Sequence, residues 1–150
     1  MSETLRGPLA SPSYHLHKAA LAWRREFGVR LRPHGLTPTQ FDALAALSWL
    51  GRTVEEPTQQ EVADFAGIDR MMASKLFAGL EGRGLLSRRG DPADGRVKRV
   101  LLSPAGRSLV DASTAVARAL DTELYSDVES PARLRAELAH VAERANSLIG

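Results

Sequence analysis

Apolar residues recur at helical spacing in the first third of the chain, with polar residues between them. Residues 13–27 carry apolar side chains at steps of four and three, which predicts an amphipathic helix. A second helix is predicted over 38–50, because Thr37 and Gln40 have the spacing of a capping box and a proline opens the helix. The apolar positions of these two helices are Leu16, Ala20, Trp23, Phe27, Phe41, Leu44, Ala45 and Leu47.

The centre of the chain predicts two short helices joined by a tight turn. Thr58 and Glu61 form a second capping-box pattern, and this helix should end at Gly67, which accepts a left-handed backbone. Asp69 is expected to cap the next helix, which runs to about Gly82. Val62, Ala63 and Phe65 give the first of these helices an apolar side, and Ala73, Leu76 and Leu80 are expected to face the core from the second. The residues expected on the opposite side of the second helix are Arg70, Met71, Ser74, Lys75 and Ala78.

A β-hairpin is predicted after these helices, because the spacing of apolar residues changes to alternation. Residues 85–89 and 97–102 form the two strands, and the residues between them are rich in turn formers. Basic residues gather at this hairpin, and such a cluster is what contact with phosphates requires. The same charges could instead protect an exposed edge strand. The basic residues are Arg88, Arg89, Arg96, Lys98 and Arg99.

Two more helices are predicted after the hairpin, over about 104–125 and from 131 onward, each opened by a Ser-Pro pair. Their apolar residues are Leu109, Val116, Leu120, Leu124, Leu134, Leu138, Val141, Ala145 and Leu148. Alternating steps of four and three in the last helix are typical of helices that pack side by side. A small central domain cannot cover all of this surface, so we predict self-association. The predicted dimerisation residues are Leu16, Leu120, Leu134, Leu138, Val141 and Leu148.

Four short motifs follow one another along the chain: L-T-x-x-Q-F at 36–41, L-E-x-x-G-L at 80–85, D-x-R at 94–96 and L-S-x-x-G at 102–106. Each motif is weak alone, but their order and spacing together are specific. In this combination they resemble the MarR family of bacterial transcription regulators. The resemblance implies a mainly α-helical protein with a small β-hairpin wing. Its winged helix-turn-helix would lie between N- and C-terminal dimerisation helices in a homodimer.

The resemblance also assigns roles at DNA. The second helix of the central pair would enter the major groove, and the hairpin would lie over the minor groove. Arg96 would be the wing-tip arginine that enters the minor groove, and Asp94 the acid that orients it. Thr58 and Gln59, at a helix N-terminus, would hold phosphates. The full predicted DNA-binding set is Thr58, Gln59, Arg70, Met71, Ser74, Lys75, Arg88, Asp94, Arg96 and Lys98.

Two features of the resemblance concern specificity. Met71 and Met72 stand where family members often carry Ser or Thr, so a base preference does not carry over. One of these methionines could touch a thymine methyl group while the other packs inward. A small aromatic or anionic effector is implied between the dimerisation helices and the winged domain, although each candidate residue could simply be a packing residue. The candidates are His15, Trp23, His34, Phe41 and Trp49.

Composition narrows the classes of function. The chain has no cysteine, which excludes disulfides, thiolate metal sites and a cysteine redox switch. His15 and His17 would point about 200° apart on a helix, so they cannot grip one metal ion without distortion. The motifs of hydrolases, zinc proteases and phosphate-binding loops are missing. We expect no enzymatic activity, no metal and no cofactor. No signal peptide or membrane span is evident, so we expect a cytoplasmic protein without a membrane partner.

These features together predict a sequence-specific DNA-binding transcription regulator. We expect a homodimeric repressor that binds an inverted-repeat operator with half-sites about one helical turn apart, and that a small-molecule effector releases. A winged-helix module that binds protein, or a regulator without an effector, remains an alternative. The expected organisation is a flexible arm over 1–12, dimerisation helices over 13–35 and 104–150, and a winged helix-turn-helix over 36–103.

Overall fold

The computed structural model describes residues 6–150, which form six α-helices, two short 3-10 helices and one two-stranded sheet. In chain order the elements are η1 (Gly7–Ala10), α1 (Pro12–Leu31), η2 (Arg32–His34), α2 (Pro38–Leu50), α3 (Gln59–Ala66), α4 (Arg70–Gly82), β1 (Leu86–Gly90), β2 (Lys98–Leu102), α5 (Pro104–Leu124) and α6 (Pro131–Ile149). The mainly α-helical fold with a β-hairpin is therefore confirmed.

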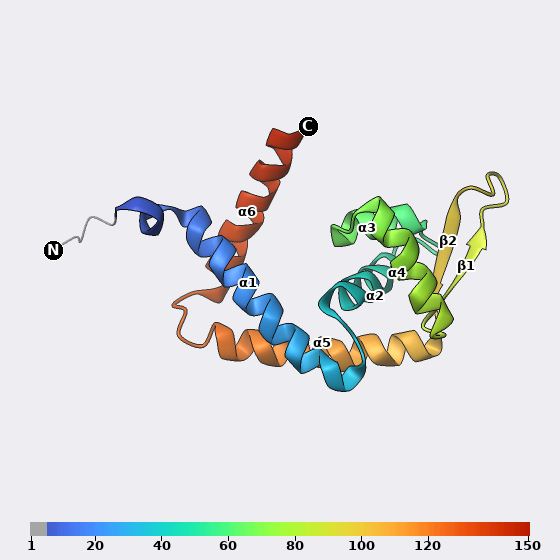
Figure 1. The fold of residues 1–150 in the computed structure, drawn as a ribbon, viewed down its shortest axis with the longest axis horizontal. Helices are drawn as coiled ribbons and strands as arrows, with labels where there is room; N and C mark the ends of the chain where they lie inside the picture. The colour runs from blue at the N-terminus through green and yellow to red at the C-terminus, as the bar shows by residue number, and fades with distance from the viewer. Residues whose placement is uncertain (1–5) are drawn as a thin grey trace. The chain divides into compact units, whose positions relative to one another are not determined.

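The described chain divides into two compact units, and the division falls inside α5 after Ala117. In the first unit, α2, α3 and α4 contact one another, and the hairpin formed by β1 and β2 contacts all three helices. Figure 1 shows the hairpin projecting from the end of α4, with its tip beyond the helices. This arrangement is a helix-turn-helix followed by a wing.

The hydrophobic core of the first unit lies where these helices meet the hairpin. Its largest fully buried side chains come from several elements, namely Phe27, Leu31, Leu44, Val62, Phe77, Leu80 and Val100. The strands are antiparallel, with Leu86 opposite Leu102 and Arg88 opposite Val100. Val100 and Leu102 are buried and Leu101 is exposed, as the alternation predicted.

Phe65, on the predicted apolar side of α3, and Leu76, an expected core position, both lie outside the buried core. Phe65 is 57% exposed, because α3 is only eight residues long and its buried stripe passes through Val62 and Ala63. On α4, Phe77 rather than Leu76 is fully buried. The buried residues of α4 are therefore Ala73, Phe77 and Leu80, at steps of four and three, and Leu76 lies at the edge of this stripe.

Helix ends follow local chemistry closely. Both capping boxes form, at Thr37 with Gln40 and at Thr58 with Glu61. The first helix is longer than predicted: it continues through Gly28 to Leu31, a fully buried residue whose packing supports the extra turn. Of the expected N-terminal arm, residues 1–5 lie outside the described residues, while Gly7–Ala10 forms an exposed 3-10 helix and α1 begins at Pro12.

Exposed apolar residues mark the helices that we expected to dimerise. On α1, Leu16 and Leu21 are exposed, and α6 contains no buried residue at all. Leu138, Val141 and Leu148 are exposed on α6, and Leu134 is half-buried. Leu120, by contrast, is only 4% exposed. Its side chain therefore has almost no surface left for the dimer contact that we predicted. No helix in residues 6–150 has the length and apolar character needed to cross a membrane.

Candidate nucleic-acid interface

The N-terminus of α3 presents two polar side chains that are fixed by local hydrogen bonds. The Thr58 hydroxyl oxygen accepts from the Glu61 N–H at 3.1 Å, which leaves the hydroxyl hydrogen available to a ligand. The Gln59 amide oxygen accepts from Arg88 Nη1 at 3.1 Å, and its NH₂ group donates to none of residues 6–150. Two donors at a helix N-terminus suit a phosphate oxygen.

The first turn of α4 is also held by side chains. Asp69 accepts from the backbone N–H groups of Met71 and Met72, at 2.9 and 3.3 Å. Arg70 donates from Nε to the Gln60 amide oxygen at 2.9 Å, which leaves its terminal nitrogens to be used elsewhere. The residues of α4 that we predicted to face outward are all exposed: Arg70, Met71, Ser74, Lys75 and Ala78.

The five basic residues of the hairpin divide into two groups. Arg88 and Arg89 are neutralised within the molecule, by Glu81 and Glu56 respectively, and Arg99 is neutralised by Asp91. Among residues 6–150, Arg96 pairs only with Asp94, two positions away on the wing, and 92% of its side chain is exposed. The Lys98 side chain is exposed without a hydrogen bond or ion pair to the residues that the structure describes. These two cations of the wing are therefore not tied to residues outside the hairpin.

Arg88, on β1, links three elements by hydrogen bonds to α3 and α4. Its guanidinium donates to Glu81 on α4 and to Gln59 on α3, and its backbone N–H donates to Glu81 Oε2 at 2.8 Å. Sequence reasoning placed Arg88 among the phosphate contacts and missed this role. Glu81 and Gln59 lie 7 and 29 positions from Arg88 in the chain. The spacing of residues along the sequence does not reveal such contacts. Glu56, which pairs with Arg89 and whose carbonyl accepts from Arg99, was missed for the same reason.

The wing tip is organised by two aspartates. Asp94 accepts from Arg96 through both carboxylate oxygens, at 3.1 and 3.2 Å, and from the Arg96 backbone N–H. These bonds, the side-chain bond first, hold the pKa of Asp94 below its usual value. The Arg99 guanidinium lowers the pKa of Asp91 in the same way, with help from the N–H groups of Ala93 and Asp94. Both acids are thus charged at neutral pH, and Asp94 holds the Arg96 guanidinium by hydrogen bonds.

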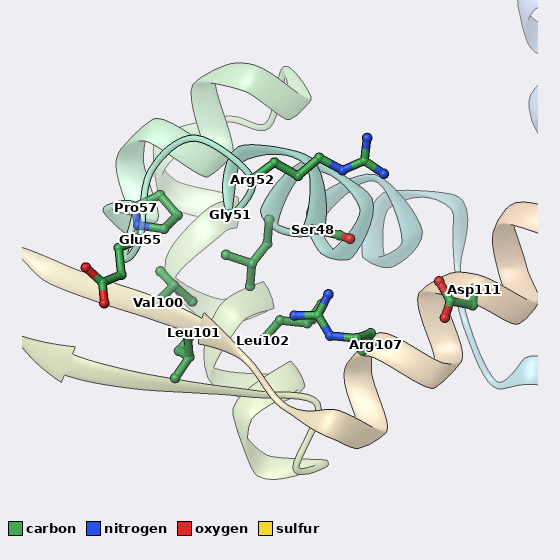
Figure 2. Close-up of a pocket in the computed structure, with 11 residues that line it drawn as sticks. Ser48, Gly51, Arg52, Glu55, Pro57, Val100, Leu101, Leu102, Arg107 and Asp111 are labelled. Carbon is green, nitrogen blue, oxygen red and sulfur yellow. The ribbon is translucent and has the colours of Figure 1, made fainter.

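A cleft of about 300 Å³ opens elsewhere on the first unit (Figure 2). Its apolar floor comes from Leu47, Val100, Leu101, Leu102 and Pro57. Its rim carries Ser48, Arg52, Glu55, Arg107 and Asp111. Figure 2 shows the guanidinium groups of Arg52 and Arg107 on either side of Ser48. Neither arginine forms an ion pair with the described acids, so the rim could hold a small anion.

The five candidate effector residues do not meet in one place. Trp23 stacks on Phe27 at 5.6 Å between ring centroids, and Phe41 meets the same ring edge-on at 5.1 Å. His15 instead bonds the Leu9 carbonyl oxygen and Trp49 lies under the Arg52 guanidinium. None of the five lines the cleft of Figure 2, although Trp49 touches one of its lining residues. Of the five candidates, Trp23 and Phe41 therefore lie together around Phe27. His15, His34 and Trp49 are not part of this cluster.

The helix-turn-helix, the wing and the display of polar groups on α3, α4 and the wing tip define a winged-helix protein. A family model described as the MarR family matches residues 34–97. An uncharacterized HTH-type transcriptional regulator of Bacillus subtilis, YdcH, is 29% identical over 120 residues, which span 80% of this chain and 82% of that protein.

Solved structures agree with this class. A probable transcriptional regulator from Pseudomonas aeruginosa is 32% identical, with a TM-score of 0.73 over 87% of this chain and 96% of that one. MosR from M. tuberculosis, solved in complex with DNA, is 26% identical, with a TM-score of 0.76 over 92% of this chain and 98% of that one. The chain belongs to the MarR family of transcription regulators.

Proposed function

We propose that this regulator binds an inverted-repeat DNA operator as a homodimer, represses transcription there, and leaves the DNA when a small molecule binds. The observation that carries the DNA-binding part is the joint display of two exposed cations that are not tied to residues outside the hairpin. Arg96 and Lys98 extend from the wing, while the outward face of α4 and the donors of Thr58 and Gln59 lie on the same compact unit. The MosR complex with DNA supports the same use of this fold.

The roles within the interface follow from chemistry. Arg70, Ser74 and Lys75 on α4 can reach base edges or phosphates in the major groove. Arg96 suits the minor groove, where a narrow A·T-rich segment concentrates negative potential. Thr58 and Gln59 hold phosphates, and Arg88 acts by positioning Gln59. This proposal places the protein in the cytoplasm with the DNA that it binds.

Dimerisation and effector release rest on further observations. The exposed apolar residues of α1 and α6 supply surface for contact with a second copy of the chain. A dimer places two winged helix-turn-helix domains on one operator. We propose two places on the first unit for a small molecule, the Trp23–Phe27–Phe41 cluster and the cleft of Figure 2. An effector acts only by binding the DNA-free state more tightly than the DNA-bound state.

The test begins with selection of DNA from random sequences by the purified protein. Fluorescence anisotropy then measures affinity for the selected site and for unrelated DNA at several salt concentrations. We expect tight binding that resists the unrelated competitor and falls steeply with salt. Arg96→Ala should weaken binding and flatten the salt dependence by about one unit of slope for each wing.

Arg118→Ala is the matched control, because Arg118 is an exposed arginine of α5 outside the proposed interface. It should leave both the affinity and the salt slope unchanged. Failure of the selection to enrich any sequence would contradict the proposal and favour a winged-helix module that binds protein. An Arg96→Ala variant with normal affinity would contradict only the role of Arg96 at the wing and would leave the rest of the proposal standing.

A further inference from the structure

Met71 stands out on α4 because it is an apolar side chain with 87% of its surface exposed. It occupies the first turn of the helix, and Asp69 fixes that turn by accepting the Met71 N–H at 2.9 Å. The position is therefore well ordered at the backbone while the thioether side chain projects into solvent. A single exposed apolar residue is common on protein surfaces, so a functional role for Met71 has to be argued from the residues around it.

Those neighbours are the groups proposed to face DNA. Ser74, Lys75 and Ala78 lie three, four and seven positions after Met71, on the same side of the helix and away from the buried Ala73–Phe77–Leu80 stripe. Met72 is less exposed, at 56%, and lies one position nearer the buried stripe. Of the two methionines, Met71 is thus the one on the outward face.

The chemistry of the side chain limits what it can recognise in a major groove. A thioether carries no N–H or O–H donor and its sulfur is a weak acceptor, so it reads no hydrogen-bonding pattern well. Among the bases, only thymine presents an apolar group there, its 5-methyl.

We infer that Met71 is a specificity-determining residue that contacts the 5-methyl group of one thymine in each operator half-site. The inference rests on the proposed function, because it requires α4 to enter the major groove. It names the feature that this regulator selects: a thymine recognised by its methyl group rather than by its hydrogen bonds. Burial of one methyl group against the methionine is worth roughly a fourfold gain in affinity for each half-site.

Replacing thymine with deoxyuridine tests the contact directly, since this change removes the methyl group and keeps every hydrogen bond. The full-length protein is measured by fluorescence anisotropy against the selected operator, with one thymine position at a time replaced in both half-sites. For the wild-type protein we expect one position at which the replacement weakens binding by roughly 15-fold, the product of two half-sites. In Met71→Ala the same replacement should cost less than about twofold.

Met72→Ala is the matched control and should keep the full wild-type response to deoxyuridine. Met71→Gln, which has a similar length and a polar end, should lose the response as Met71→Ala does, and circular dichroism shows whether each variant is folded. The inference is overturned if no thymine position responds, or if the response disappears in Met72→Ala rather than in the Met71 variants. A protein that selects no DNA at all overturns the proposed function, and the inference with it, whereas specific binding without a deoxyuridine response overturns the inference alone.

Discussion

Gly106 packs so closely against the backbone of Leu85 that a Cβ atom at Gly106 would lie 2.0 Å from the Leu85 carbonyl oxygen. Ser103 strengthens this contact, because its hydroxyl donates to the Gly84 carbonyl at 2.6 Å and accepts from the Gly106 N–H at 3.0 Å. The start of α5 is thereby fastened to the segment between α4 and β1. The L-S-x-x-G motif thus has a steric reason for its glycine.

We predict that Gly106→Ala destabilises the protein, because the backbone of Leu85 must move to admit the methyl group. Overpacking of this kind costs about 1–3 kcal/mol or more in the free energy of unfolding. Chemical denaturation followed by circular dichroism measures the change. Gly79→Ala is the control: nothing lies within 4 Å of a Cβ there, and alanine in a helix should stabilise by about 0.5–1 kcal/mol. Equal stability of the two variants would contradict the steric account.

Two basic residues of the hairpin should separate stability from DNA binding. Arg88→Ala breaks the hydrogen bonds to Glu81 and Gln59, and we expect a loss of about 1–2 kcal/mol in the free energy of unfolding. Lys98→Ala removes the same charge from an exposed, unpaired position and should leave stability within about 0.5 kcal/mol. Denaturation curves and the salt dependence of DNA binding are measured for both.

The salt dependence supplies the second half of that comparison. Lys98→Ala should reduce the slope of affinity against salt, because a free cation near the phosphates is lost. A Lys98→Ala variant with an unchanged slope would show that Arg96 is the wing's only contact. An Arg88→Ala variant with full stability would show that the link between α3, α4 and β1 does not need the guanidinium.

Local chemistry explains which parts of the structure the sequence predicts well. Capping boxes such as Thr58 with Glu61 join residues three positions apart, and the alternation of Val100 and Leu102 needs only neighbouring residues. The two helices of the helix-turn-helix and the hairpin follow from such patterns. Phe65 was misplaced because α3 is too short for its apolar stripe to be read from spacing.

The candidate site was predicted less completely, because its electrostatics depend on residues far apart in the chain. Arg89 is paired with Glu56, 33 positions away, and Arg88 reaches Gln59 across 29 positions. A count of charges along the hairpin therefore overestimates the positive charge available to DNA. Arg96 and Lys98 could be identified as the cations that are not tied to residues outside the hairpin only after the partners of Arg88, Arg89 and Arg99 were placed.

The wing tip should show depressed carboxyl pKa values in a pH titration by NMR. Hydrogen bonds from Arg96 hold the pKa of Asp94 below 3.8, and Arg99 does the same for Asp91. Because these pKa values are lowered by folding, the stabilisation is present above about pH 3.8 and is lost as the pH falls through the folded values. Arg96→Ala should raise the pKa of Asp94 toward 3.8 and leave that of Asp91 low. A response of both acids to one substitution would show that the two pairs are coupled.

Leu138→Glu should weaken dimerisation, because a carboxylate on the exposed apolar face of α6 cannot be buried against a second copy without a large desolvation cost. Sedimentation velocity at several protein concentrations measures the monomer–dimer equilibrium. Leu101→Glu is the control, since Leu101 is a similarly exposed leucine on the wing. A Leu138→Glu protein that still sediments as a dimer would place the interface on other residues.

The two tryptophans report on the two places proposed for an effector. Trp23 belongs to the cluster with Phe27, whereas Trp49 stacks under Arg52, which lines the cleft of Figure 2. Compounds from a library of small aromatic and anionic molecules are first screened for release of the selected DNA. Each active compound is then titrated into Trp49→Phe and Trp23→Phe, which leave a single reporter apiece.

We expect an effector that occupies the aromatic cluster to change the emission of Trp23 in the Trp49→Phe protein and to leave Trp49 unchanged in the Trp23→Phe protein. A ring bound beside Trp23 would also displace solvent from a side chain that is only half-buried. The opposite pattern would assign the effector to the cleft, where Arg107→Ala should then weaken its binding. Release of DNA without a change at either tryptophan would contradict both placements, because a ligand at either one lies against or next to an indole ring.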